Sequence, residues 1–202
     1  MTDVFEKFKS IPGRLLIDTC ILNLLQDEGE YIFEGIVPDN YTNDNNIPLE
    51  WSALRSIFKI NERASFQFLV SPITFAELAN EKNMLISQRR LFWVLDVLDV
   101  WLVMLEETGD RISEGGTVRH RFKLPPELQE FEQHLLTIPD FRRDPFDRLL
   151  LVQYKMGNCD AFLTLDCNTI CRHKDWLSAQ GIRVLRPSEF LEILKPWATI
   201  WY

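Results

Sequence analysis

Two short apolar runs that each end at an acidic residue constrain the fold of this chain most strongly. One is Arg14-Leu-Leu-Ile, which leads into Asp18, and the other is Ala161-Phe-Leu-Thr-Leu, which leads into Asp166. Runs this short and this apolar are typical of strands buried on both faces, as in a parallel sheet. Because open parallel sheets bind ligands at the carboxyl ends of their strands, the two acids are predicted to lie at a ligand-binding edge.

Two more strands and several helices are predicted between and after these runs. Residues 66–70 and 182–185 have the apolar, β-branched or aromatic character of strands. Helices are expected over residues 19–25, 48–64, 74–107 with a break near 80–83, 124–137 and 142–157. Another helix is expected between residues 166 and 182, and a final one begins at Pro187. Strands that alternate with helices favour an α/β fold in which helices cover both faces of a parallel sheet.

The length of 202 residues favours one domain with added segments. Residues 26–48, rich in Asp, Glu, Asn, Gly and Pro, are expected to form a surface insertion. An enlarged helical region is expected over residues 80–140, with a loop at 108–123. The aromatic tail, residues 197–202, is expected to dock on the core or to form a contact surface.

No targeting or membrane segment is expected from the sequence. The first ten residues lack the basic and then apolar profile of a secretory signal. The most apolar stretch, residues 91–105, is interrupted by Asp96 and Asp99 and is shorter than the roughly 20 residues that span a bilayer. We therefore expect a buried helix there, no membrane partner and a cytoplasmic location.

The cysteines are expected to be reduced thiols, in keeping with that location. A zinc site formed by Cys159, Cys167, Cys171 and His173 is the alternative. Their spacing contains no Cys-x2-Cys pair, so small buried apolar side chains are the preferred interpretation.

Four acids have positions that would bring them together at the carboxyl edge of the sheet. Asp18 and Asp166 follow strands, while Glu77 and Asp147 lie in the first turns of predicted helices. Clustered carboxylates repel each other and raise each other's pKa, so a fold tolerates them mainly when divalent cations neutralise them. Oxygen ligands favour Mg²⁺ or Mn²⁺, and paired ions of this kind catalyse phosphodiester hydrolysis. A structural alternative for Glu77 is a capping box with Thr74.

The acidic composition limits the kinds of nucleic-acid partner. With 30 acidic and 22 basic residues the net charge is −8, which argues against a protein that coats duplexes through a basic surface. A local basic groove remains compatible with an acidic total. Arg142 and Arg143 precede Asp147, and Arg119 and Arg121 belong to the densest basic run, residues 119–123. These four arginines are candidates for binding substrate phosphates. The alternative for residues 119–123 is that they form a solvated face.

Four motifs carry a resemblance to a known family. They are Leu15-Leu-Ile-Asp18-Thr19, Ser71-Pro-Ile-Thr-Phe-Ala-Glu77-Leu, Asp144-Pro-Phe-Asp147-Arg-Leu-Leu and Phe162-Leu-Thr164-Leu-Asp166. Their order and spacing resemble those of PIN-domain nucleases, and the third motif resembles the VapC-type toxin branch. The resemblance spans residues 14–194 and implies a three-layer α/β/α sandwich with a central parallel sheet.

The resemblance also implies site residues and partners. It implies that Asp18, Glu77, Asp147 and Asp166 hold the metal ions, and that Thr19, Thr164, Asp144 and Asn168 are accessory residues. For Asp144 the structural alternative is an N-cap before Pro145, and for Asp160 a structural role is preferred. The implied activity is endoribonuclease cleavage that leaves a 5′-phosphate and a 3′-hydroxyl, with single-stranded DNA as a further possible substrate. A homodimer and, for a toxin, an antitoxin partner are also implied.

The sequence disfavours one alternative to this function and leaves a second one open. Haloacid-dehalogenase-like phosphotransfer requires a second acid two residues after the first, where this chain has Cys20. A non-catalytic PIN-like interaction module with weak metal binding, built around residues 91–105 and the aromatic tail, is the stronger alternative.

Overall fold

A parallel five-stranded sheet forms the centre of the molecule. The computed structural model describes residues 10–39, 41, 47–98, 100–105, 111–112, 118–119 and 123–197. The strand order is β3-β2-β1-β6-β7, and every neighbouring pair in this sheet is parallel. The strands are β1 (Arg14–Ile17), β2 (Gln67–Val70), β3 (Leu102–Met104), β6 (Ala161–Leu163) and β7 (Val184–Leu185). A separate antiparallel pair joins β4 (Arg111–Ile112) to β5 (Val118–Arg119).

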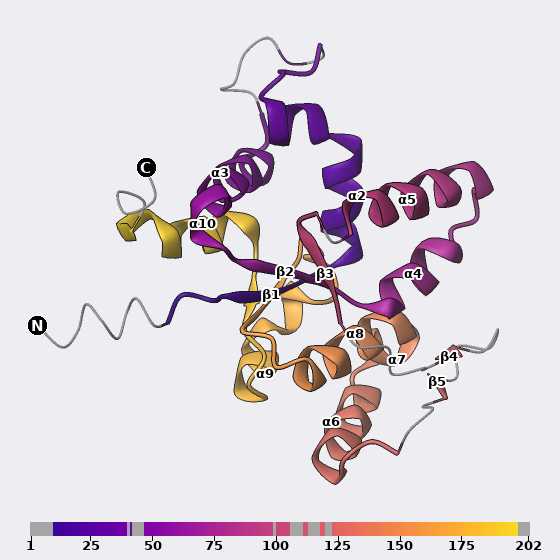
Figure 1. The fold of residues 1–202 in the computed structure, drawn as a ribbon. Helices are drawn as coiled ribbons and strands as arrows, with labels where there is room; N and C mark the ends of the chain where they lie inside the picture. Colours follow the sequence, from indigo (N-terminus) through magenta and orange to yellow (C-terminus); the bar gives the residue numbers. More distant parts are fainter. Residues whose placement is uncertain are drawn as a thin grey trace, which may run out of the picture.

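Helices cover both faces of the sheet, which confirms the expected three-layer α/β/α architecture. Figure 1 shows α3 and α10 on one side of the sheet and α8 and α9 on the other. The helices are α2 (Thr19–Asp27), α3 (Leu49–Ala64), α4 (Pro72–Ala79), α5 (Met84–Val97), α6 (Pro126–Thr137), α7 (Pro139–Arg143), α8 (Pro145–Met156), α9 (Lys174–Ala179) and α10 (Pro187–Leu194). Within the described residues, none of the helices combines the length and apolar character needed to cross a membrane.

The core is divided by the alternation of side chains along each strand. Leu15 and Ile17 of β1 pack into a cluster with apolar residues of α2, α3 and α10. Leu16, between them, packs into a second cluster with residues of α6, α8 and α9. Because successive residues of a strand point to opposite faces, a strand covered on both faces has to be apolar throughout. This explains why β1 is a continuous apolar run.

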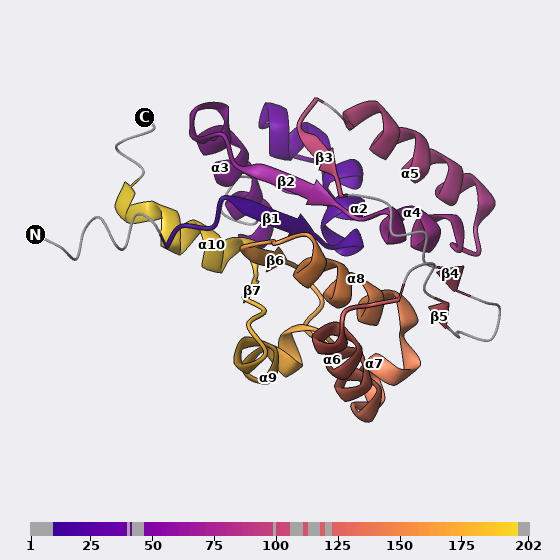
Figure 2. The same ribbon diagram turned by 60° about the horizontal axis from the view of Figure 1, so that its bottom comes forward.

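The sheet has a topological switch point between β1 and β6. From β1 the chain adds β2 and then β3 on one side, and it later adds β6 and then β7 on the other side. Ile17 pairs with Leu163, and the backbone N–H of Asp18 donates to the carbonyl of Leu163 at 3.0 Å. The residues that follow β1 and β6 therefore lie side by side, at the place where open α/β sheets form their ligand-binding crevice. Figure 2 shows the arrowheads of β1 and β2 pointing toward α2 and α4.

The prediction of a buried helix over residues 91–105 is wrong. Helix α5 ends at Val97, and Leu102–Met104 pairs with β2 as an edge strand of the sheet. The pairing buries Leu102 completely while Val103 stays exposed. An apolar run does not reveal whether its backbone partners lie within it or in a distant strand, so the local pattern could not distinguish the two.

Residues 26–48, expected to be a surface insertion, contribute to the core in their described part. Helix α2 extends to Asp27, and a π-helix follows over Glu30–Glu34. Tyr31 and Ile32 in that π-helix are buried, and Arg55 of α3 donates to the carbonyl of Tyr31 at 2.8 Å. The segment therefore covers one face of the sheet beside α3.

Helix α4, which carries Glu77, is capped by Ser71 and not by Thr74 as the sequence pattern suggested. The Ser71 Oγ accepts a hydrogen bond from the N–H of Ile73 at 3.0 Å, and Pro72 occupies the first turn. Thr74 Oγ1 is buried and lacks a hydrogen-bond partner among the described residues. Because the helix begins earlier than expected, Glu77 lies in its second turn and is not required for the cap.

The two candidate caps respond differently to substitution. Ser71→Ala removes the cap, together with the buried hydrogen bond that Ser71 Oγ donates to Gln153 Oε1, and should lower the free energy of unfolding by about 1–3 kcal/mol. Thr74→Val replaces an unpaired buried hydroxyl with an isosteric methyl group and should be neutral or stabilising. Chemical denaturation measures both, with exposed Ser178→Ala as the control. A larger loss in Thr74→Val than in Ser71→Ala would contradict the assigned cap.

Candidate acidic site at the carboxyl edge of the sheet

Asp18 lies at the switch point and is held by two side-chain donors. Its Oδ2 accepts a hydrogen bond from Thr164 Oγ1 and another from Cys20 Sγ, the latter at 3.0 Å. Thr164 is fully buried at the end of β6, so the first bond joins the ends of the two adjacent strands. Burial raises the pKa of Asp18, and the hydrogen bonds from Cys20 and Thr164 partly oppose this.

Glu77 reaches the same edge of the sheet from α4. Its Oε2 accepts a hydrogen bond from Thr19 Oγ1 at 2.5 Å, so the predicted accessory hydroxyl holds this carboxylate. Burial raises the pKa of Glu77 to about 7; the Thr19 bond lowers it, and repulsion by Asp18 and Asp144 raises it further.

Asp144 and Asp147 enter the site from the start of α8. The Oδ1 of Asp144 accepts from the backbone N–H groups of Phe146 and Asp147, at 2.9 and 3.2 Å, which confirms the N-cap. The pKa of Asp147 rises to about 9, first through burial and then through repulsion by Asp144, Asp18, Asp166 and Glu77.

Asp166 lies beyond the end of β6 and organises the turn that follows it. Its Oδ1 accepts from the backbone N–H groups of Asn168 and Thr169, at 2.8 and 3.0 Å. Its own N–H donates to Thr164 Oγ1 at 2.9 Å. Asn168 is exposed and donates its backbone N–H to Asp166, and among the described residues its side-chain amide makes no hydrogen bond to the acids.

The structure thus brings the four predicted acids, together with Asp144, to one edge of the sheet, where the other four lie within electrostatic reach of Asp147. The charged groups that act most strongly on the pKa of Glu77 and Asp147 are all carboxylates. An oxygen-only donor set whose members repel one another fits a hard divalent cation such as Mg²⁺ or Mn²⁺. Among the described His, Cys, Asp and Glu residues, no three already form a finished metal-binding group. The carboxylates would therefore have to draw closer around an ion.

The candidate phosphate-binding arginines divide into two groups. Arg142 and Arg143 are exposed at the end of α7, directly before Asp144. Arg119 belongs to β5, but its side chain and all of Arg121 lie outside the described residues. Of the four arginines, only the side chains of the first pair are described, and this pair adjoins the acidic site along the chain, directly before Asp144.

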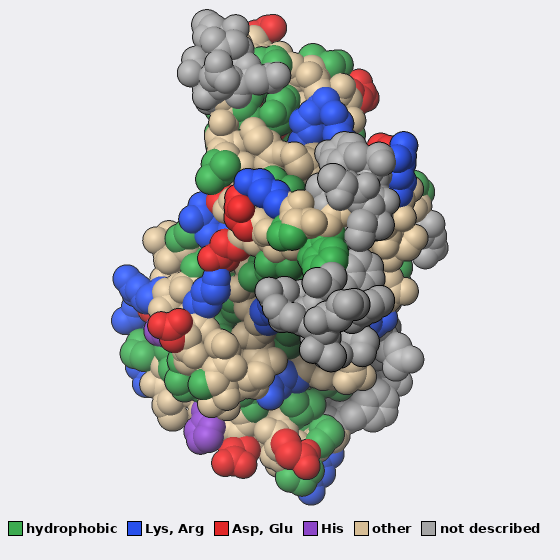
Figure 3. Space-filling model, turned by 90° about the vertical axis from the view of Figure 1, so that its left-hand side faces the viewer, with side chains coloured by type: hydrophobic (Ala, Val, Ile, Leu, Met, Phe, Trp, Pro, Cys, Tyr) green, Lys and Arg blue, Asp and Glu red, His purple; other side chains and the backbone are tan. Residues whose placement is uncertain are grey.

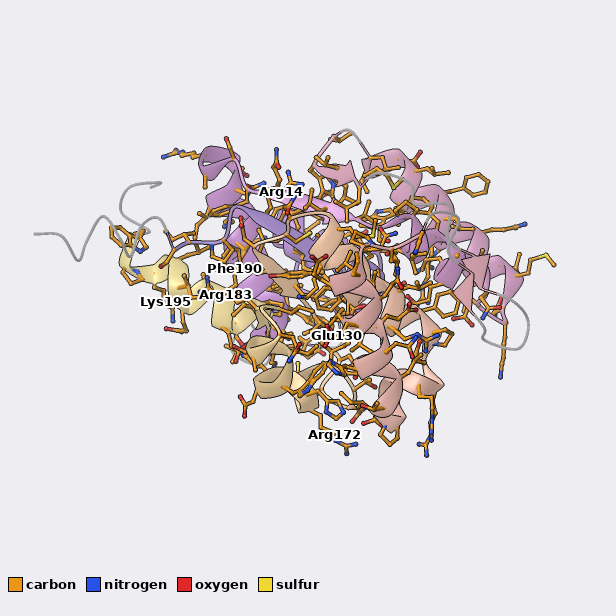
Figure 4. The ribbon with its side chains drawn as sticks, turned by 90° about the horizontal axis from the view of Figure 1, so that it is seen from below. Arg14, Glu130, Arg172, Arg183, Phe190 and Lys195 are labelled. Atoms are coloured by element: carbon orange, nitrogen blue, oxygen red, sulfur yellow. The ribbon has the colours of Figure 1, made fainter. Side chains whose placement is uncertain are left out.

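Other basic side chains lie elsewhere or have structural partners. Arg14, at the start of β1, donates to Gln67 and to the carbonyl of Gly157, at the opposite end of the strand from Asp18. Arg183 and Lys195 lie beside α10 (Figure 4). On the face shown in Figure 3, basic side chains lie between acidic and apolar ones.

Two residues near the acids carry contacts that the sequence did not reveal. Cys20 stands where haloacid-dehalogenase-like chemistry would require a second acid, and the structure shows that its thiol donates directly to Asp18. Arg148 follows Asp147 but points inward, where it donates to the carbonyl of Phe141 at 3.0 Å and pairs with Glu132 at 3.7 Å. A long basic residue in a helix is normally exposed, so only the packing of α6 against α8 reveals its buried position.

The alternative zinc site has little geometric support. His173 Nε2 lies 2.9 Å from Asp140 Oδ2, and Cys159 packs against the apolar cluster around α8. Cys167 and Cys171 interact with each other. Asp160, for which a structural role was preferred, accepts from the N–H groups of Gly13 and Arg14 at 2.9 and 2.8 Å, which confirms that role.

No protein-family model, curated protein or solved structure shows a significant match to this chain. The functional argument therefore rests on the residues of the site and their geometry.

The raised pKa values predict how the stability of the metal-free protein depends on pH. Glu77 and Asp147 have ordinary pKa values of 4.5 and 3.8 and folded values of about 7 and 9. At a pH between the ordinary and the folded pKa of each group, the folded state holds more protons than the unfolded chain. The free energy of unfolding should therefore fall as the pH rises through this range. Thermal unfolding in a chelator, from about pH 5 to about pH 9, measures this.

Asp147→Asn should flatten this pH dependence, because the amide does not titrate. Adding Mg²⁺ should raise the melting temperature of the wild type more at high pH than at low pH, since only the ionised carboxylates bind the cation. Asp175→Asn, at an exposed position of α9, is the control. An unchanged pH dependence in Asp147→Asn would contradict the raised pKa assigned to Asp147.

Proposed function

We propose that this chain is a metal-dependent endoribonuclease that hydrolyses phosphodiester bonds at the acidic site. The observation that carries the proposal is the convergence of five carboxylates at the switch point, where the other four all raise the pKa of Asp147. Asp147 is affected by Asp18, Glu77, Asp144 and Asp166 together. Such a cluster destabilises a fold unless cations neutralise it, which makes a divalent-ion site its best explanation.

The proposed roles follow from the contacts of each side chain. Asp18, Glu77, Asp147 and Asp166 would hold the ions. Thr164 and Thr19 orient the carboxylates of Asp18 and Glu77, to which they donate hydrogen bonds. Asp144 adds negative charge while it caps α8. Two Mg²⁺ or Mn²⁺ ions, when bound, would supply Lewis-acid activation of a water and charge stabilisation at the phosphate.

The order of the four motifs supports RNA as the substrate. They resemble, in order, the motifs of PIN-domain nucleases, and the segment around Asp144 and Asp147 resembles VapC-type toxins. Arg142 and Arg143 are exposed beside the site and would contact substrate phosphates. With a net charge of −8, binding would depend on these local cations and the ions, and single-stranded DNA is a second possible substrate. An antitoxin partner is part of the same proposal.

Cleavage of a panel of labelled RNAs and single-stranded DNAs tests the activity. We expect cleavage with Mg²⁺ or Mn²⁺ and none in a chelator. Asp18→Asn and Asp147→Asn should each reduce the rate by more than about 100-fold, beyond the loss typical of residues that only orient ligands. Asp175→Asn, which alters an exposed acid on α9, should leave the rate unchanged. Absence of cleavage across the panel, or full activity in Asp18→Asn, would contradict the proposal.

An exposed apolar stripe on α5 favours a second candidate, a non-catalytic interaction module. Leu85 is 78% exposed, Phe92 is 65% exposed, and Met84 and Leu95 are also exposed. Their spacing places them on one side of the helix, and α5 lies along the outer edge of the molecule (Figure 2). Apolar side chains gathered on one face are typical of a contact with another protein. The expected homodimer would use this stripe, and an interaction module would use it without cleavage.

Phe92→Asp tests the contact through α5. We expect the wild type to sediment as a dimer and Phe92→Asp as a monomer, because a buried unpaired charge opposes association. At dilutions where the wild type is also monomeric, both proteins should unfold at similar temperatures, since the side chain is exposed in the monomer. Gln88→Asp, at the polar position of the same face, should weaken the dimer less. A wild type that is monomeric at all concentrations would exclude this contact between copies.

A further inference from the structure

The Cys20 thiol occupies a position between the two strand ends that carry the acids. It lies in the first turn of α2, two residues after Asp18. Its Sγ is 3.0 Å from Asp18 Oδ2, 3.2 Å from the backbone nitrogen of Leu165 and 3.6 Å from Thr164 Oγ1. The sulfur thus bridges the start of α2 and the segment that follows β6.

The donors and acceptors around the thiol define the direction of its hydrogen bonds. The backbone N–H of Leu165 donates to Sγ, so the sulfur is the acceptor there. An ionised carboxylate only accepts, so the S–H donates to Asp18 Oδ2. A second chain of hydrogen bonds reaches the same Asp18 oxygen. The N–H of Asp166 donates to Thr164 Oγ1, and the Thr164 hydroxyl donates to Asp18 Oδ2. Two short hydrogen-bonded chains therefore connect Asp18 to the backbone that carries Asp166.

Both chains end on one oxygen of the Asp18 carboxylate. Because Thr164 and Cys20 share Oδ2, they fix the rotation of the carboxylate, and neither occupies Oδ1. A ligand carboxylate held in this way through one oxygen presents the other in a defined direction. One donor would leave the carboxylate free to swing about a single bond, whereas two donors from different elements do not.

We propose that Cys20 is a positioning residue for the metal ligand Asp18, whose orientation it fixes together with Thr164. This inference rests on the proposed metal-dependent function. It predicts that the affinity of the site for a hard divalent ion depends on the S–H donor, although the sulfur is not itself a ligand. A serine at this position keeps a donor, while alanine and valine remove it.

Titration calorimetry of the metal-free full chain with Mn²⁺ tests the inference. We expect Cys20→Ala to weaken Mn²⁺ binding by about 10-fold or more, the usual cost of losing a group that orients a ligand. Cys20→Val, which fills the space without a donor, should show a similar loss, and Cys20→Ser should recover most of the affinity. Cys159→Ala, the same change at a cysteine outside the site, should bind like the wild type. Nuclease activity of Cys20→Ala should return at high Mn²⁺ concentration.

The possible results separate this inference from the proposed function. Equal Mn²⁺ affinity in the wild type, Cys20→Ala and Cys20→Val overturns the positioning role and leaves the nuclease proposal intact. Wild-type protein that binds no Mn²⁺ overturns both. A loss of Cd²⁺ binding without a loss of Mn²⁺ binding identifies the thiol as a ligand for soft ions and also overturns the positioning role. Because Cys20→Val fills the thiol's space, it keeps the test valid if Cys20→Ala unfolds.

Discussion

The pairing of β1 with β6 is the interaction on which the site depends. It places Ile17 beside Leu163, and the next residues of the two strands, Asp18 and Thr164, meet at the carboxyl edge. Both strands are buried on both faces, so a shift of one residue would move apolar side chains between the two halves of the core. The packing that fixes the register of the sheet thus also fixes the geometry of the acidic site.

Burial of the carboxylates, and after it the repulsion among them, is the energetic cost of that geometry. The raised pKa values of Glu77 and Asp147 show that the folded, metal-free site favours protonation of these two groups. A bound cation would reverse this preference, so ion binding, protonation and stability are linked at this edge of the sheet. The surrounding hydrogen bonds from Thr19, Thr164 and Cys20 hold the carboxylates in place while they repel each other.

Much of the fold could be predicted from local patterns, because β1, β2 and β6 are short apolar runs and α8 starts at an Asp-Pro cap. Strand β3 was missed because its strand character comes from its pairing with β2. The cap of α4 was misplaced because both Ser71 and Thr74 have the right chemistry, and only the backbone geometry shows which hydroxyl meets a free N–H. Cys20 gave no signal, since a single cysteine has no pattern that indicates its partners.

The sequence by itself determined the class of fold and the identity of the acids that follow the strands, because periodicity and element order are local properties of the chain. Only the tertiary structure decided that Asp18, Glu77, Asp144 and Asp166 all act on Asp147, and that Thr19, Thr164 and Cys20 hold the carboxylates of Glu77 and Asp18. These contacts join residues that are far apart in the sequence, such as Asp18 and Thr164. Their distances in space depend on the register of β1 with β6 and on the packing of α4 and α8. Hydrogen bonding and electrostatic repulsion vary steeply with distance. A sequence pattern can therefore identify the residues of the acidic site but cannot predict which of them interact.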